Sequence, residues 1–257
     1  MRQLDLNADV GEGQPGVDAA VIPLMSSVNI ACGLHAGDPS TMAATVRLAV
    51  AHGVAVGAHP GYADRETFGR RPEHHSTDEI RDLLLYQLGA LDAIVRAEGT
   101  QLEHVKPHGA LYNQAERDPE LARAIIATIR RFNPRLRLIG RASSAMQRVA
   151  ATVGHPFAAE AFADRRYQAD GSLQSRAEPG AILVDAGEVV AQVRSLITVG
   201  EVRASDGSRV KVAFETLCLH GDTPGAPQLA VQIREQLHAL GVGVSPPRSM
   251  AVDTLPP

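Results

Sequence analysis

Residues 4–10, Leu-Asp-Leu-Asn-Ala-Asp-Val, alternate between apolar and polar side chains, as a half-buried β-strand does. One side of such a strand carries Leu4 and Leu6, and the other carries Asn7 and Asp9. If the apolar side packs against helices, the polar side points into the interior of a barrel. We therefore expect this segment to be the first strand of a closed sheet.

Seven further apolar runs follow, with helical segments between most of them. They begin near Ser27, Val54, His104, Leu136, Phe157, Ile182 and Leu217. Strands that alternate with helices are typical of a parallel α/β fold. Eight runs in 257 residues favour a complete or distorted TIM-like (β/α) barrel, which takes roughly 250 residues. We predict a single α/β barrel domain over residues 1–245 and an irregular C-terminal tail over residues 246–257.

The segments between the runs carry helix-start signals. Asp38-Pro39 and Asp118-Pro119 have the pattern of an N-cap followed by a first-turn proline, and Ser76 and Glu79 have capping-box spacing. Two more helices are expected to start at Ser143 or Ser144 and at Pro227, the latter ending at Gly241. Residues 202–214 instead alternate around Asp206-Gly207, which predicts a β-hairpin inserted before the last barrel strand.

Composition narrows the function. The net charge of −4, the low aromatic content of 4% and the absence of Trp argue against nucleic-acid binding. No apolar run approaches the ~18–20 residues of a membrane span, and residues 1–7 do not have the pattern of a signal peptide. Cys32 and Cys218 are isolated, so a disulfide framework is not expected and both are interpreted as small core residues. We expect a cytoplasmic protein that does not contact membranes.

Polar residues collect where the predicted strands end. The carboxyl ends of barrel strands converge on one face, where active sites are built. We predict a catalytic set drawn from these positions: Asp9, His35, His59, Lys106, His108, Asp164 and His220. Four histidines at matching strand ends are harder to explain by structure alone than any single one. Five other histidines are expected to be exposed or to pack structurally: His52, His74, His75, His155 and His238.

One motif is misleading. Residues 11–16, Gly-Glu-Gly-Gln-Pro-Gly, match the dinucleotide fingerprint GxGxxG after a strand. Pro15 lies inside it, Glu12 would place negative charge beside a pyrophosphate, and no clear helix is expected to begin at the motif. The chain also lacks a Gly-Lys dipeptide and therefore a P-loop. Neither nucleotide motif is supported.

The strand-end segments resemble those of the LamB/YcsF family, whose members include the A subunit of ATP-dependent 5-oxoprolinase. The similar stretches run in order along nearly the whole chain: residues 5–12, 29–39, 57–60, 68–71, 105–113, 162–165 and 220–224. Two stretches depart from the family pattern. Gly61-Tyr62-Ala63-Asp64 stands where Ser-Tyr-Pro-Asp is expected, and Gln174-Ser175 replaces Val-Pro.

The resemblance implies a distorted β/α barrel that helps convert 5-oxo-L-proline to L-glutamate with hydrolysis of ATP. It also implies two partner subunits, B and C, which would bind most of the ATP. With the motif residues included, the predicted substrate-binding set is Asn7, Glu12, Arg70, Tyr112, Asn113, Glu160, Arg165 and Asp222. Arg70 or Arg165 from this set, or Lys106 from the catalytic set, is expected to hold the carboxylate of the lactam.

The residue types fit this chemistry but leave alternatives open. A histidine or aspartate could orient water, and Lys106 could stabilise developing charge on the amide oxygen. Asp9 with two or three histidines could instead bind a divalent metal ion, as in a metal-dependent amidohydrolase or deacetylase. The chain could also be a non-catalytic subunit that binds the lactam and delivers it to its partners.

Overall fold

The computed structural model describes residues 2–246. The tail predicted for residues 246–257 lies, apart from its first residue, outside that range. No helix in the described range is long and apolar enough to cross a membrane.

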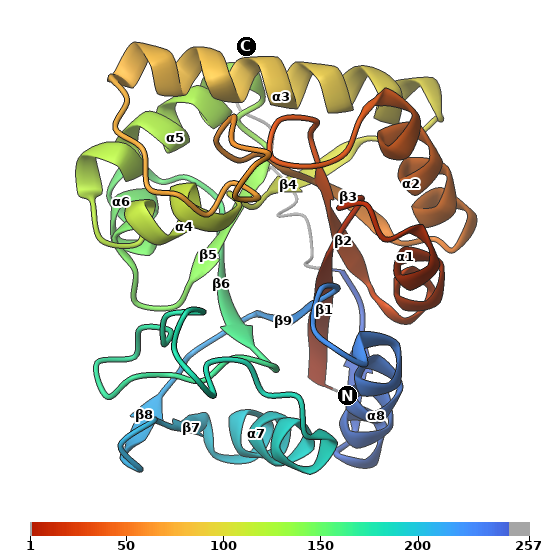
Figure 1. Cartoon of the computed structure of the whole chain (residues 1–257), viewed down its shortest axis with the longest axis vertical. Helices are drawn as coiled ribbons and strands as arrows, with labels where there is room; N and C mark the ends of the chain where they lie inside the picture. The colour runs from red at the N-terminus through yellow and green to blue at the C-terminus, as the bar shows by residue number, and fades with distance from the viewer. Residues whose placement is uncertain (1, 247–257) are drawn as a thin grey trace.

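A closed parallel barrel forms the centre of the molecule (Figure 1). Within residues 2–246 its strands are β1 (Arg2–Val10), β2 (Ser27–Ala31), β3 (Ala55–His59), β4 (Leu102–Val105), β5 (Arg137–Arg141), β6 (Phe157–Phe162) and β9 (Thr216–His220). The barrel closes because β1 pairs with both β2 and β9. A short strand, β10 (Val242–Val244), pairs with the start of β1. The predicted distorted barrel is confirmed.

The prediction of a barrel strand near Ile182 is wrong. Ile182 makes only an isolated antiparallel bridge with Arg165, and β6 pairs directly with β9 without an intervening strand. The apolar run is only four residues long, 181–184, and follows Pro179-Gly180. Its hydrogen bond from the Leu183 amide to the Asp164 carbonyl (2.8 Å) folds it back on the loop after β6. The barrel therefore has seven strands within the described residues, not eight.

Helices surround the barrel, as Figure 1 shows. Those in the described range are α1 (Pro15–Val21), α2 (Pro39–Ala51), α3 (Thr77–Ala97), α4 (Gly109–Ala115), α5 (Pro119–Phe132), α6 (Ala145–Val153), α7 (Ala186–Val199) and α8 (Ala226–Ala239), with a single 3₁₀ turn at Ile22–Leu24. The predicted caps are present: Asp38 accepts from the Thr41 amide, and Ser76 forms a full capping box. Ser144, not Ser143, caps α6. The hairpin is also confirmed, as β7 (Glu201–Arg203) and β8 (Arg209–Lys211).

Helix α1 corrects one premise about the GxGxxG segment. A helix does begin inside the motif, at Pro15, because proline is favoured at a first helical position. The loop amide of Gly11, however, donates to Oδ2 of Asp18 at 3.0 Å. A carboxylate of the same segment thus binds an amide that a phosphate would use in a dinucleotide site.

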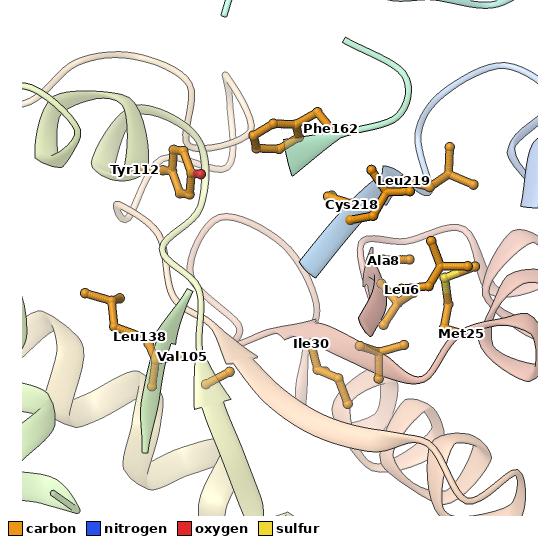
Figure 2. Packing of buried hydrophobic residues seen from close by; sticks show 14 of the residues in the cluster. Leu6, Ala8, Met25, Ile30, Val105, Tyr112, Leu138, Phe162, Cys218 and Leu219 are labelled. Atoms are coloured by element: carbon orange, nitrogen blue, oxygen red, sulfur yellow. The ribbon is translucent and has the colours of Figure 1, made fainter. Parts of the chain in front are cut away.

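The barrel wall separates an apolar layer from a polar interior. Leu6 and Ala8 of β1 pack with Met25 and Ile30 in the hydrophobic core (Figure 2). The alternate residues of β1 point inward, as predicted from the sequence, and Asn7 is fully buried among polar side chains.

The wall also makes room for a large interior side chain. A Cβ atom on Gly57 of β3 would lie 2.0 Å from Nε2 of His104, so only glycine leaves space for this imidazole.

Candidate functional site

A buried ammonium group lies at the centre of the barrel. Nζ of Lys106, at the end of β4, is 3.0 Å from Oδ1 of Asp9 and 2.9 Å from Oε1 of Glu160. It is also 3.1 Å from Sγ of Cys218. Burial alone would lower the pKa of Lys106, but attraction to Asp9 and the other neighbours raises it well above its usual range. The side chain is therefore a fixed positive charge.

Amide side chains hold the two carboxylates in place. Nδ2 of Asn7 donates to Oε1 of Glu160 at 3.1 Å, and Nδ2 of Asn29 donates to Oδ1 of Asp9 at 2.8 Å. The Tyr112 hydroxyl donates to the second oxygen of Glu160 at 3.0 Å. Because their oxygens are already hydrogen-bonded, these carboxylates are oriented before any ligand enters.

A second unit combines Asp164, after β6, with His220, at the end of β9. Nδ1 of His220 lies 2.9 Å from Oδ1 of Asp164, and Thr223 donates a further hydrogen bond to this carboxylate. Burial would raise the pKa of Asp164, but attraction to His220 and these hydrogen bonds lower it to about 2. The ionised carboxylate fixes the Nδ1–H tautomer, so Nε2 carries the lone pair. The imidazole also stacks on Phe162, with centroids 5.5 Å apart.

Glu12 lies in a cluster with the other three histidines of the predicted catalytic set, His35, His59 and His108. Nε2 of His59 and Nδ1 of His108 are 3.0 Å apart, and Oε1 of Glu12 lies 3.8 Å and 3.3 Å from them. His35 stacks face to face on His108, with centroids 3.8 Å apart. Burial lowers the pKa of His35 to about 2 and, with the nearby His35, lowers that of His108 well below its usual range. Burial and repulsion from Asp9 raise the pKa of Glu12 well above its usual range.

Two groups of described residues have metal-ligand spacing. One is Glu12, His59 and His108, and the other is Asp9, Cys218 and His220. In each group the ligand atoms lie within 4.8 Å of one another.

Two arginines stand at the rim. Nη2 of Arg70 and Nη1 of Arg176 both approach Oδ2 of Asp222, at 2.6 Å and 2.9 Å. A single carboxylate therefore balances two guanidinium groups, which leaves positive charge for an anionic ligand. Arg165 differs from them, because its guanidinium donates to the backbone carbonyls of Gln174 and Ala181. That arginine shapes the loop after β6, although it also borders the cavity.

One cavity of about 940 Å³ is bordered by all of these groups: Lys106, His220, the cluster around Glu12, and the two rim arginines. Five of the seven predicted catalytic residues line it: Asp9, His59, Lys106, His108 and His220. His35 and Asp164 lie behind His108 and His220, with 1% and 0% of their surface exposed, so these two members of the predicted catalytic set do not line the cavity. Of the predicted substrate-binding residues, Glu12, Arg70, Tyr112, Asn113, Arg165 and Asp222 line the cavity, whereas Asn7 and Glu160 lie beneath Lys106.

Sequence reasoning missed several members of the site. Phe162 stacks on His220, Asn29 bridges Asn7 and Asp9, and Arg176 shares Asp222 with Arg70. The first two lie in stretches that carry the family resemblance, so their positions were available as a signal. Arg176 stands in an irregular loop, and no periodicity indicates where its side chain points.

Comparisons with known proteins agree along the whole barrel. A family model described as LamB/YcsF matches residues 4–252. The chain is similar to the A subunit of 5-oxoprolinase from Methylococcus capsulatus, with 50% identity over 95% of both chains. It is 46% identical to the protein of the same name from Erwinia tasmaniensis, over 95% of this chain and 99% of that one. Its structure is similar to that of a lactam utilization protein from Thermus thermophilus, with a TM-score of 0.88, 44% identity and coverage of 95% and 99%.

Proposed function

The chain belongs to the LamB/YcsF family, and we propose that it is the A subunit of a 5-oxoprolinase, which opens the cyclic amide of 5-oxo-L-proline to L-glutamate. Curated relatives of that name are 46–50% identical to the chain over nearly its full length. The observation that carries the proposal is the fixed ammonium of Lys106 beneath a cavity that is also lined by His220 and Arg176. These groups supply three things that lactam hydrolysis needs.

Arg176 and Arg70 are suited to bind the carboxylate of the substrate. Both guanidinium groups border the cavity and compete for one oxygen of Asp222. A ligand carboxylate would give the pair a second anion and charge-assisted hydrogen bonds. Lys106, which the sequence also suggested for this role, is already enclosed by two carboxylates and is better suited to the reacting end.

Lys106 and His220 are suited to the reacting carbonyl group. When water adds to the carbonyl carbon, negative charge grows on the amide oxygen, and a preorganised ammonium stabilises that charge. Nε2 of His220 accepts the proton that the attacking water loses, while Asp164 stabilises the resulting imidazolium ion. The carbon–nitrogen bond of the ring then breaks, and the nitrogen takes the proton from the His220 imidazolium ion and becomes the amino group of glutamate.

Activation of the lactam by ATP belongs, in this proposal, mainly to partner subunits. An amide carbonyl is a poor electrophile, and transfer of the terminal phosphate of ATP to its oxygen makes the carbon more reactive. Ring opening then leaves an acyl phosphate, which a second water molecule hydrolyses to the carboxylate and inorganic phosphate. The chain has no Gly-Lys dipeptide and therefore no P-loop of its own. We assign most of the ATP binding to subunits B and C and place the complex in the cytoplasm.

A reconstituted complex tests the proposal. Co-purified with its partner subunits, the chain should support ATP-dependent release of glutamate from 5-oxo-L-proline, whereas the chain alone should show negligible lactam-dependent ATP hydrolysis. His220→Ala should lower turnover by about 10²–10⁴-fold, because a general base is lost. His75→Ala, on the surface beside Glu73, is the matched control. Unchanged turnover in a folded His220→Ala complex would contradict the assigned role, and absence of glutamate release in the wild-type complex would contradict the proposed function.

A further inference from the structure

The cluster of Glu12, His59 and His108 contains lone pairs that face one another. Nδ1 of His59 lies 2.7 Å from the carbonyl oxygen of Lys106, and Nε2 of His108 lies 2.8 Å from that of Phe68. A carbonyl oxygen only accepts hydrogen bonds, so both of these nitrogens carry the proton of the neutral ring. The other nitrogens, Nε2 of His59 and Nδ1 of His108, then both present lone pairs to each other at 3.0 Å.

The carboxylates add to this excess of acceptors. Oε1 of Glu12 lies within 4 Å of both nitrogens, is buried and has no hydrogen-bond partner among the described residues. Oδ2 of Asp9 approaches Nε2 of His59 at 3.4 Å. Buried acceptors that converge in this way repel one another unless a proton or a cation lies between them, and a metal ion that binds there displaces the proton.

We propose that Glu12, His59 and His108 bind one divalent transition-metal ion, and that zinc fits this ligand set best. Zinc bonds of ~2.0–2.1 Å in a tetrahedron place the ligand atoms roughly 3.3–3.4 Å apart. The three separations here are 3.0 Å, 3.3 Å and 3.8 Å, centred on that value. The site goes beyond the proposed function, since none of the steps derived above uses a metal ion.

The surroundings of the cluster are those of a metal site. Metal-binding histidines usually donate their second N–H to a backbone carbonyl or a carboxylate, which fixes the ring, and both histidines here do so. His35 packs flat against the His108 ring and restricts its rotation. Gly69, in the left-handed region with φ +64°, leaves room for this stack, because a Cβ atom there would lie 2.8 Å from that of His35.

The fourth position faces the cavity. Glu12, His59 and His108 all border it, so the three protein ligands leave one side of the ion open to water or to the carbonyl oxygen of a substrate. This arrangement is characteristic of catalytic zinc sites, whereas structural sites use four protein ligands.

The other group with ligand spacing is less suitable. Nζ of Lys106 lies 3.0 Å from Oδ1 of Asp9 and 3.1 Å from Sγ of Cys218. An ammonium group therefore already supplies the positive charge at that point, and a divalent ion would be repelled by it. Burial raises the pKa of the Cys218 thiol well above its usual range, which further disfavours metal binding by the sulfur.

Metal binding is tested on the full chain without an affinity tag. After removal of metal by a chelator, titration with zinc should show one ion per chain by calorimetry, and cobalt should give the absorption spectrum of a four-coordinate ion without a thiolate band. Glu12→Gln and His108→Ala should each weaken zinc binding by more than about 100-fold, because loss of a ligand exceeds the loss of a supporting contact. Cys218→Ser should bind zinc as the wild type does. His75→Ala controls for adventitious binding at the surface pair of His75 and Glu73.

Three results would overturn the assignment: no zinc binding by the folded wild-type chain, undiminished binding by both ligand variants, or a thiolate-to-cobalt charge-transfer band. Circular dichroism verifies that each variant is folded. If the variants do not fold, anomalous diffraction at the zinc edge from wild-type crystals decides the question. A peak between Glu12, His59 and His108 supports the site, and its absence or a different location refutes it.

Discussion

The buried carboxylate of Asp5, on β1, should make the stability of the protein depend on pH. Its carboxylate is only 2% exposed and accepts hydrogen bonds from Ser26 at 2.7 Å, from Ser27 at 2.8 Å and from Thr216 at 2.5 Å. Burial raises the pKa of Asp5 from 3.8 to about 6, although the three hydroxyl groups counteract it. The folded protein therefore holds this proton more tightly than the unfolded chain does.

The sign and size of the effect follow from this pKa. A raised pKa contributes stability that is fully present below pH 3.8 and is lost as the pH rises to about 6. A difference of about two pKa units corresponds to roughly 3 kcal/mol. Asp5→Asn is neutral at every pH, and its amide group can donate to the hydroxyl oxygens that it meets. The free energy of unfolding of the variant, relative to wild type, should rise by about 3 kcal/mol from pH 3.5 to 7.

Urea unfolding followed by circular dichroism across this pH range measures that difference. Subtracting the wild-type curve removes the contributions of the carboxylates that do not interact with Asp5. Asp206→Asn is a control of opposite sign, since hydrogen bonds from Ser208 lower the pKa of Asp206. A flat or falling difference for Asp5→Asn would refute the reasoning, because it would mean that the three hydroxyl groups outweigh burial.

Three further predictions concern the interior and the rim. Lys106→Met should lower the free energy of unfolding by about 3–5 kcal/mol in urea titrations, because it leaves the buried carboxylate of Glu160 without its cation. Adding Glu160→Gln removes that unpaired charge and should restore part of the loss. Gly57→Ala should lower the free energy of unfolding by about 1–3 kcal/mol, because the added methyl group collides with the imidazole of His104. His104→Ala in the same chain should relieve that collision, so additive losses of stability in thermal melts would contradict this contact. Arg176→Gln should raise the KM of the complex for 5-oxo-L-proline roughly 10–100-fold and remove its preference over the carboxamide analogue, and an unchanged preference would exclude the carboxylate contact.

The barrel and much of its polar interior could be predicted from the sequence. In β1 the alternation of Leu6 and Ala8 with Asn7 and Asp9 has the period of a strand, and the structure separates these residues in that way. Helix starts were equally visible, because an N-cap such as Asp38 acts through local hydrogen bonds. Both signals depend on neighbours within a few residues.

Features that depend on distant partners were not predictable. The apolar run at Ile182 had the composition of a strand, but β6 and β9 pair directly and leave it no place in the barrel. The packing of Asp164 behind His220 depends on contacts 56 residues apart. The shared use of Asp222 by Arg70 and Arg176 depends on loop shape, which carries no periodicity. Sequence patterns therefore placed these residues at one end of the barrel without resolving which of them face the cavity.

The charges around the cavity also restrict how a lactam can lie in it. Asp9 divides the reacting end into two halves: Oδ1 pairs with the ammonium of Lys106, and Oδ2 turns toward Nε2 of His59. The first half already contains its cation, and a metal ion bound in the second half is balanced by Glu12 and Asp9, so neither offers an unshared positive charge to the substrate's carboxylate. Such charge is available at the rim, where two guanidinium groups share Asp222. A bound 5-oxo-L-proline should therefore place its carboxylate at the rim and its amide carbonyl toward Lys106, which brings the bond to be broken between the ammonium and His220.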